Sequence, residues 1–294
     1  MLKLGSNKIK QTLTAWLFML PCIIIFFVFL WQPFFSGLYM SFFKTNGFEM
    51  VDFVGFNNYI DVIMSKDFLR SLKNTFMYAF FSLLLGFPIP VVMAIIINEI
   101  TKGKGIFRAA IYLPSMIPAV VSAILWGFLY EPSENGILNI ILTSVGIPAQ
   151  QWLQDSSRVI LWIVVAMTWG GFGPTTILYI ADLQSVNLSL YEAASMDGAG
   201  FFRKIRHITI PHMRGLMKMF FIMQFISVFQ VFEQPLAMSG GGPNGASSTL
   251  LLLTYNNLFN NMNVGKASAI SGIVSVILVC LSAIYFSVQK KENN

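Results

Sequence analysis

The stretch QTLTAWLFMLPCIIIFFVFLWQPFFSGLYMSFF, residues 11–43, contains no charged side chain. A bilayer-spanning helix needs about 20 consecutive apolar residues, so this stretch is long enough to cross a membrane. The whole chain of 294 residues shares the bias, since 55% of its residues are hydrophobic and 11% are charged. An average soluble domain has roughly 25% charged residues. The sequence therefore predicts an all-α integral membrane protein.

Four further uncharged runs of sufficient length follow, over residues 74–98, 109–130, 159–181 and 267–289. A sixth span is less regular, because Lys218 and Glu233 lie about 22 Å apart near its two ends, where long side chains reach the interfaces. We expect a single transmembrane domain over residues 1–294, with spans near 13–42, 74–98, 107–130, 159–181, 215–238 and 267–289.

The distribution of lysine and arginine predicts the topology. Six spans place both termini on the same side, and basic residues gather on the cytoplasmic side of membrane proteins. Thirteen basic residues lie in the tails and in the two loops on the side of the termini: Lys3, Lys8, Lys10, Lys102, Lys104, Arg108, Arg203, Lys204, Arg206, Arg214, Lys218, Lys290 and Lys291. Six lie in the other loops. The sequence predicts a multi-pass membrane protein with both termini cytoplasmic, and the net charge of +6 does not require a nucleic-acid partner.

Two features leave the course of the spans open. Residues 135–154 are uncharged but rich in Asn, Gln, Gly and Pro, which favours a re-entrant or interfacial loop over a span. Prolines also lie inside predicted spans, at Pro88, Pro90, Pro114, Pro118 and Pro174. Each removes a backbone hydrogen bond, so it marks either a kink or a broken helix that lines a cavity.

Motifs and residue groupings that are typical of enzyme active sites are missing from the sequence. The chain has no phosphate-binding Gly-Lys-Ser/Thr motif. Cys22 and Cys280 lie within predicted spans, where we expect packing roles. His207 and His212 belong to a basic segment and do not form a two-histidine metal site. We expect a non-catalytic protein that binds no cofactor or metal itself.

The polar segment 182–214 separates the fourth and fifth predicted spans and contains EAASMDG, residues 192–198. Ser189 and Glu192 have capping-box spacing, which predicts a helix start. Gly198 suits a helix end in the left-handed conformation, and Pro211 suits the first turn of the next span. The segment is thus either a solvated connecting helix or a low-profile surface for a partner.

Four ordered motifs favour the second interpretation. The segment from Glu192 to Pro211 resembles the cytoplasmic EAA loop of ABC-importer permeases. In addition, FVGFNNY (53–59), FRAAIYLPSMIP (107–118) and SGGGPNGASST (239–249) resemble the first outside loop, the third-span entrance and the Gly-Gly-Pro loop of the maltose and multiple-sugar branch.

This resemblance implies a type I ABC importer permease with six spans and a cytoplasmic coupling helix. Its partners would be a second permease in a heterodimer, a cytosolic ATPase dimer that binds ATP and Mg²⁺, an extracytoplasmic solute-binding protein and a sugar solute. The resemblance assigns ATPase coupling to residues Glu192, Ala193, Ala194, Asp197, Gly198, Ala199 and Pro211. We call residues 182–214 the coupling loop.

A candidate solute path combines residue pattern and resemblance. Gln224, Ser227, Gln230, Val231 and Gln234 fall within about a 120° arc if the fifth span is one helix, as lining residues or as interhelical hydrogen-bonding groups. The resemblance adds Ala119, Met167, Gly170, Gly171 and Val228. Trp169 and Phe172 either stack on sugar rings or serve as packing and interface aromatics. Glu233, near the outer end of the fifth span, either touches solute at the mouth of the path or reaches water.

An ion-coupled secondary transporter of a small polar solute is the alternative. Such proteins carry ionisable residues inside their spans, whereas the span interiors here contain none and both histidines lie in the coupling loop. The sequence therefore predicts an ATP-driven carbohydrate importer subunit more strongly than an ion-coupled transporter.

Overall fold

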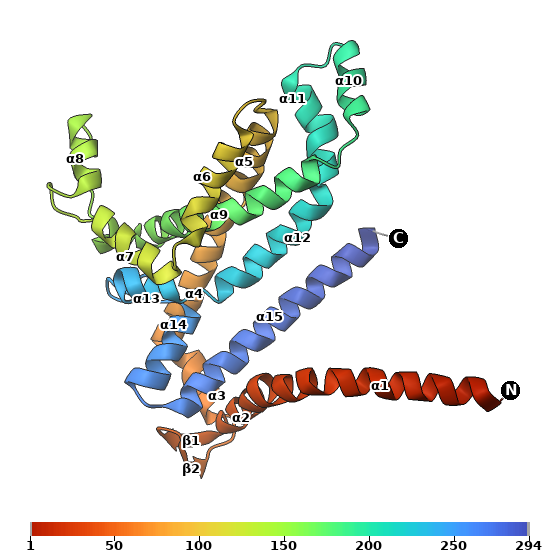
Figure 1. Ribbon diagram of the computed structural model, residues 1–294. Coiled ribbons are helices and arrows are strands. Elements are labelled where there is room, and N and C mark those ends of the chain that lie inside the picture. Colours follow the sequence, from red (N-terminus) through yellow and green to blue (C-terminus); the bar gives the residue numbers. More distant parts are fainter. Residues whose placement is uncertain (1, 293–294) are drawn as a thin grey trace. The chain divides into compact units, whose positions relative to one another are not determined.

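The computed structural model covers residues 2–292 and is mainly helical (Figure 1). The chain divides into two compact units, residues 2–64 with 254–273, and residues 65–253 with 274–292.

The first unit contains a long apolar helix, a hairpin and the start of the last helix. Its elements are α1 (Leu2–Phe26), η1 (Phe27–Trp31), α2 (Gln32–Met40), β1 (Phe43–Asn46), β2 (Glu49–Phe53), α3 (Asn57–Met64), η6 (Asn256–Asn260) and the beginning of α15 (Val264–Glu292). The hairpin is antiparallel, with Phe43 opposite Phe53. The amide of Asn58 donates 2.8 Å hydrogen bonds to the carbonyls of Ser41 and Phe43, which fixes the hairpin to α3.

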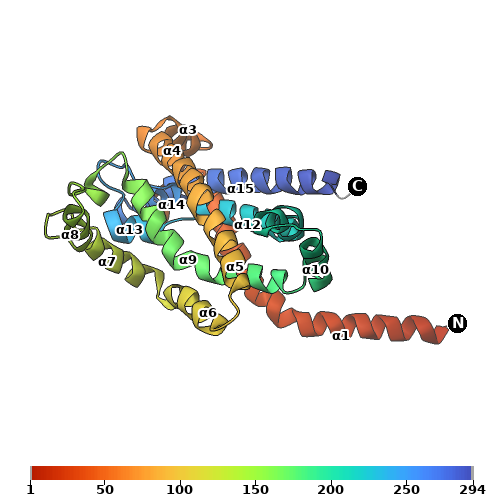
Figure 2. The same cartoon turned by 90° about the horizontal axis from the view of Figure 1, so that it is seen from above.

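The second unit carries the remaining helices. They are α4 (Lys66–Phe81), η2 (Ser82–Gly86), α5 (Pro88–Glu99), α6 (Lys104–Tyr112), η3 (Leu113–Met116), α7 (Ala119–Leu129), α8 (Ile137–Ser144), η4 (Trp152–Gln154), α9 (Val159–Leu183), α10 (Leu188–Met196), α11 (Phe201–Lys204), η5 (Ile205–Thr209), α12 (Ile210–Phe229), α13 (Glu233–Ser239) and α14 (Leu250–Tyr255). Figure 2 shows α4 and α5 as one continuous run beside α9.

The lengths of the helices agree with six membrane crossings. Within residues 2–292, four helical runs are long and apolar enough to span a bilayer: residues 11–40, 66–99, 159–183 and 264–283. Two bent helix pairs bring the number to as many as 6.

Prolines produce wide helical turns at three places. The π-helical segments η1, η2 and η5 each end two residues before a proline, at Pro33, Pro88 and Pro211. In η2 the N–H of Phe87 bonds to the Ser82 carbonyl, five residues back, at 3.1 Å. In an α-helix the proline ring clashes with the carbonyl four residues earlier. A single π turn widens the helix at this place, so the helix continues past the proline.

The other span prolines behave differently from one another. At Ile117 and Pro118 the third span bends by 95°, between η3 and α7. In contrast, α9 runs without interruption through Pro174.

The fifth predicted span, 215–238, is wrong as a single straight helix. Helix α12 ends at Phe229, and α13 begins at Glu233 with a 50° bend between them. The break is held from outside the helix, because the Thr249 hydroxyl donates a 2.8 Å hydrogen bond to the Val231 carbonyl. Tertiary contacts therefore override the apolar run that predicted one helix.

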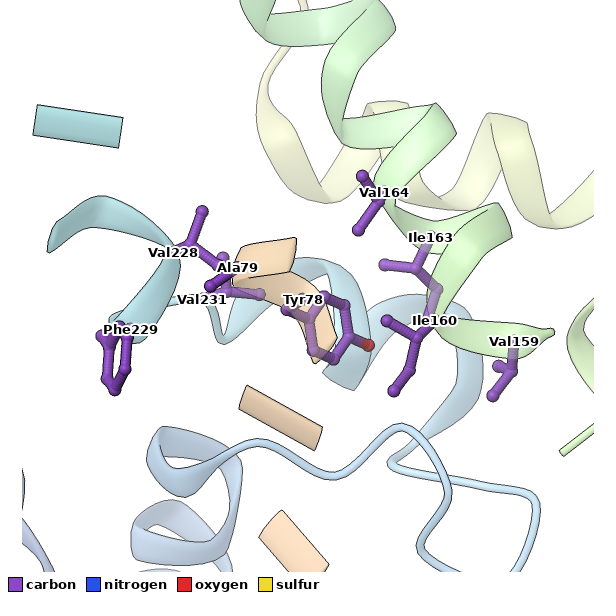
Figure 3. Close-up of a cluster of buried hydrophobic side chains, with 9 residues drawn as sticks. All are labelled: Tyr78, Ala79, Val159, Ile160, Ile163, Val164, Val228, Phe229 and Val231. Carbon is purple, nitrogen blue, oxygen red and sulfur yellow. The ribbon is translucent and has the colours of Figure 1, made fainter. Parts of the chain in front are cut away.

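A hydrophobic core joins α4, α9 and the end of α12 (Figure 3). Tyr78 is fully buried between Ile160 and Ile163 of α9 on one side and Val228 on the other. The Tyr78 hydroxyl donates to the Ser247 carbonyl at 3.2 Å, and the Leu250 N–H donates to the Thr75 hydroxyl at 3.1 Å. The Gly-Gly-Pro loop is thereby bonded to α4.

Residues 135–154 form a short helix and a folded loop. Helix α8 has 8 residues, which is too few to span the bilayer. The buried Asn139 organises the loop: its Oδ1 accepts hydrogen bonds at 2.9 Å from the Gln150 N–H and from the Trp152 indole N–H.

Glycine substitutions test the packing of α6 against α9. A Cβ added at Gly173 would overlap the backbone carbonyl of Ile111, whereas a Cβ at Gly171 would meet no atom within 4 Å. Gly173→Ala should lower stability by about 1–3 kcal/mol, because a backbone contact cannot yield as a side chain does. Gly171→Ala should be as stable as the wild type. Melting temperatures in detergent check both, and equal values for the two variants would contradict this packing.

Candidate functional site

The coupling loop begins with an asparagine cap. Asn187 Oδ1 accepts a 3.1 Å hydrogen bond from the Ser189 N–H, and α10 starts at Leu188. The predicted capping box of Ser189 and Glu192 is therefore wrong, because Asn187 caps the helix and Ser189 already lies in its first turn.

The end of α10 matches the prediction. Gly198 adopts φ +74°, and the Ala199 N–H bonds to the Ala194 carbonyl at 2.8 Å. This arrangement is a helix ending by a left-handed glycine. Pro211 also lies in the first turn of α12, as predicted.

Two side-chain hydrogen bonds make the coupling loop a compact unit. The hydroxyls of Tyr191 and Thr209 lie 3.0 Å apart, and Lys204 Nζ donates to Ser195 Oγ at 2.8 Å. The outward surface holds Glu192, Ala193, Asp197 and Gly198, whereas Ala194 and Ala199 are half-buried.

Large apolar side chains are exposed on the same loop. Met196 is 89% exposed and Phe202 is 82% exposed, next to the charged Glu192 and Asp197. An exposed apolar group bordered by charges is typical of a protein-binding surface.

A continuous helical run connects this loop to the interior. Residues 201–229, which comprise α11, η5 and α12, form one uninterrupted run. Its far end carries Gln224, Ser227 and Val228, so the coupling loop and the candidate solute path share a helix (Figure 1).

Two adjacent cavities lie along α9. The first has a volume of about 380 Å³ and is lined by Ser82, Gly86, Phe87, Pro90, Met167, Thr168, Gly171, Phe172, Thr175, Tyr179, Phe220, Met223, Gln224, Ser227 and Val228. The second has a volume of about 410 Å³ and is lined by Ser115, Met116, Ile117, Pro118, Ala119, Ser122, Ala123, Ala166, Met167, Gly170, Gly171, Gln234 and Met238. Met167 and Gly171 belong to both linings.

Most of the predicted path residues line one of these cavities. Phe172, Gln224, Ser227 and Val228 line the first; Ala119, Gly170 and Gln234 line the second; Met167 and Gly171 line both.

Four predicted path residues lie outside both linings. Trp169 packs edge-on against Trp126, with ring centroids 5.8 Å apart, and Val231 is buried in the core. Gln230 and Glu233 are exposed at the break between α12 and α13. The predicted stripe is interrupted after α12, because the helical period does not continue across a 50° bend, and its last member, Gln234, lines the second cavity from α13.

Several lining residues were not predicted, and a helical stripe identifies them. Thr168, Thr175 and Tyr179 lie on the same face of α9 as Gly171 and Phe172, at spacings of three and four residues. Applying the stripe analysis to the fourth span would have found them.

Gln224 has a structural role in the first cavity. Its Nε2 donates a 2.7 Å hydrogen bond to the Ser82 carbonyl, which also accepts the π-helical bond from Phe87. A Cβ at Gly86 would lie 2.6 Å from this Nε2, so the glycine leaves room for the amide. Gln224 thus joins α12 to the wide turn of the second span.

Neither cavity lining contains Asp, Glu, Lys, Arg or His. In the part of the chain that the structure describes, no three His, Cys, Asp or Glu residues are grouped to hold a metal ion. The linings offer hydroxyls, amides, aromatic rings and thioethers, a composition that suits an uncharged polar solute.

A helical membrane bundle with cavities that contain no charged side chain, and with an exposed loop of charged and apolar residues, has the architecture of a solute-transport subunit. Residues 62–292 match the family described as "Binding-protein-dependent transport system inner membrane component", and the chain belongs to this family.

Similar proteins agree with this assignment over nearly the full length. A probable ABC transporter permease, YurN of Bacillus subtilis, is 31% identical over 98% of this chain and 99% of its own. The trehalose/maltose transport system permease MalF of Thermococcus litoralis is 31% identical over 96% and 95%.

Solved structures show the same fold. A chain of a bacterial ABC transporter involved in the import of the acidic polysaccharide alginate has a TM-score of 0.86 and 25% identity, covering 97% of this chain and 98% of that one. The alginate transporter in complex with its alginate pentasaccharide-bound periplasmic protein gives a TM-score of 0.84 at 26% identity, covering 95% and 94%. The predicted all-α type I importer permease fold is confirmed, and the findings support this assignment over the ion-coupled alternative.

The close approach of the Gln224 amide to Gly86 can be tested by a double-mutant cycle. Gln224→Ala should cost about 0.5–1.5 kcal/mol through its lost hydrogen bond. Gly86→Ala should destabilise the wild type by crowding the amide, but much less in the Gln224→Ala background, where no amide remains. Melting temperatures of the four proteins measure the coupling. Ser227→Ala is the matched control, because the Ser227 hydroxyl bonds only to its own helix, at the Gln224 carbonyl. Additive effects of the two substitutions would contradict the contact between the Gln224 amide and position 86.

Proposed function

We propose that this chain is a permease subunit of an ABC importer that moves a neutral carbohydrate into the cytoplasm by alternating access. The names of similar proteins support a carbohydrate: they include permeases for trehalose and maltose, for arabinooligosaccharides and for multiple sugars. The observation that carries the proposal is that both cavity linings combine hydroxyl and amide groups with apolar side chains and contain no charged side chain.

The same lining favours a neutral solute over an anionic one. Other similar proteins are named for sn-glycerol-3-phosphate or for alginate, which is acidic. An anion buried without a cation beside it bears a large desolvation cost. The linings of this chain supply no cation, so they fit hydroxyl-rich neutral solutes better.

The coupling loop is the proposed contact with the ATPase. Glu192 is exposed and has no ion-pair partner among the residues that the structure describes, so it is free to meet a cation on another subunit. Met196 and Phe202 supply apolar area around it. Motion of a docked ATPase would pass through the continuous run 201–229 to the wall of the first cavity.

The proposed assembly has four kinds of component. A second, similar permease completes the solute path, two cytosolic ATPase subunits bind ATP and Mg²⁺, and an extracytoplasmic protein delivers the solute. This chain performs no catalysis and binds no cofactor. Both termini and the coupling loop lie on the cytoplasmic side of a bacterial-type plasma membrane, as the basic residues indicate.

Two substitutions in the coupling loop test the docking. Glu192→Lys inverts the exposed charge, and Gly198→Asp places a side chain at φ +74° on the docking surface. Both proteins should insert normally but lose solute uptake at least about tenfold. The reason is that the residues that dominate a protein interface each contribute more than about 1 kcal/mol to binding. Gly198→Asn has a side chain of the same size without the charge and also tolerates the left-handed conformation, so it should retain more of the uptake than Gly198→Asp.

The measurement is uptake and solute-stimulated ATP hydrolysis by the reconstituted importer. Wild-type uptake in both Glu192→Lys and Gly198→Asp would rule out the coupling assignment.

The solute class is tested on the companion binding protein. Thermal-shift assays with trehalose, maltose, arabinotriose, glycerol 3-phosphate and an alginate oligosaccharide should show stabilisation by a neutral sugar, because ligands that bind only the folded state raise the melting temperature. Stabilisation by the acidic solutes alone would contradict the neutral-solute proposal.

A further inference from the structure

Tyr179 is a buried residue of the first cavity whose polar group is unused. It is 0% exposed, it lines the cavity, and its hydroxyl has no hydrogen-bond partner within the described part of the chain. A buried hydroxyl without a partner is unfavourable, so such a group in a cavity points to a ligand that supplies the bond.

The ring of Tyr179 is held in place by packing. It meets Phe220 of α12 edge-on, with ring centroids 5.2 Å apart, and both rings belong to one apolar cluster. The ring is therefore already ordered, so that little side-chain entropy would be lost if its buried hydroxyl bound a ligand.

Its position separates Tyr179 from the residues that define the predicted path. On α9 it lies eight residues, about 12 Å, beyond Gly171 in the direction of the coupling loop. The second cavity reaches α9 only at residues 166–171, whereas the first extends from Met167 to Tyr179. The two cavities thus follow one another along the helix and meet at Met167 and Gly171.

Besides Tyr179, the lining of the first cavity offers further groups for a sugar. Thr175 lies one turn earlier on the same helix face, Ser82 and Gln224 are on the facing helices, and the rings of Phe87 and Phe172 line the same space. Tyrosine and sugar hydroxyls both donate and accept hydrogen bonds, so either hydroxyl can be the donor.

We propose that the first cavity is a second, inward station for the carbohydrate, where the Tyr179 hydroxyl forms a hydrogen bond with a solute hydroxyl. The second cavity is the outer station, and the side chain of Met167 with the open space at Gly171 forms the boundary between them. This assignment rests on the proposed function and adds to it a position-specific contact on the inward part of the path.

The test uses the assembled importer with its permease partner, ATPase and binding protein in proteoliposomes. Tyr179→Phe removes only the hydroxyl and keeps the ring against Phe220. Tyr130→Phe is the matched control: Tyr130 is also buried, but its hydroxyl donates to the Trp162 carbonyl at 3.0 Å and it lines neither cavity. The probes are trehalose and maltose and the monodeoxy analogues of each.

If the contact exists, the wild type should take up one deoxy analogue about tenfold more slowly than its parent, and Tyr179→Phe should take up the parent at that reduced rate. Tyr179→Phe should no longer distinguish parent from analogue at that position, a result that a purely structural role would not give. Tyr130→Phe should keep both the full discrimination and the wild-type rate of basal ATP hydrolysis, since Tyr130 lines neither cavity.

Thr175→Val provides a second variant on the same lining and should also slow uptake of the parent sugar. Wild-type rates and full discrimination in both Tyr179→Phe and Thr175→Val would overturn the inward station and leave only water at the Tyr179 hydroxyl. Failure of the wild type itself to take up any neutral sugar would instead overturn the proposed function, so the two failures are distinguishable.

Discussion

The hydrogen-bonding needs of the backbone in lipid govern this structure. No water is present in the hydrocarbon core to bond an N–H or C=O group, so each proline in a span requires a local solution. The chain uses π turns before Pro33 and Pro88, and a sharp bend at Pro118. At the Ser82 carbonyl the solution reaches across helices, because the Gln224 amide adds a second hydrogen bond. The π turn η2, which precedes Pro88, thus forms part of the wall of the first cavity.

Residue patterns predicted the helical class, the six apolar segments and the end of α10 at Gly198, because these depend on local composition and on a single backbone conformation. They failed where distant residues decide. The break at residues 230–232 depends on the Thr249 hydroxyl, and no local signal in the apolar run reveals it. The capping error arose for a different reason: Asn187 and Ser189 are both good caps, and the sequence alone did not rank them.

In the candidate site, too, the features set by local sequence were predicted and those set by distant residues were not. Path residues projected on α9 and α12 mostly line the two cavities, since both helices keep a regular period through Phe229. Past Phe229, Gln230 and Val231 lie outside both linings, whereas Gln234 lines the second cavity. The stripe of Thr168, Thr175 and Tyr179 was equally regular but was not sought, since attention fell on glutamines rather than hydroxyls. The coupling loop and the first cavity share the run 201–229, so one rigid element serves both ends of the proposed mechanism.

The glycines of α9 bear on how such a protein changes its cargo. Gly173 is fixed by the backbone of Ile111, but Gly171, two residues earlier, faces open space in both cavities. A new side chain at position 171 would change the lining of both cavities without meeting the backbone contact at Gly173. In the proposed mechanism, solute preference and fold stability can therefore change independently within three residues, which gives this lineage a short mutational route to new solutes.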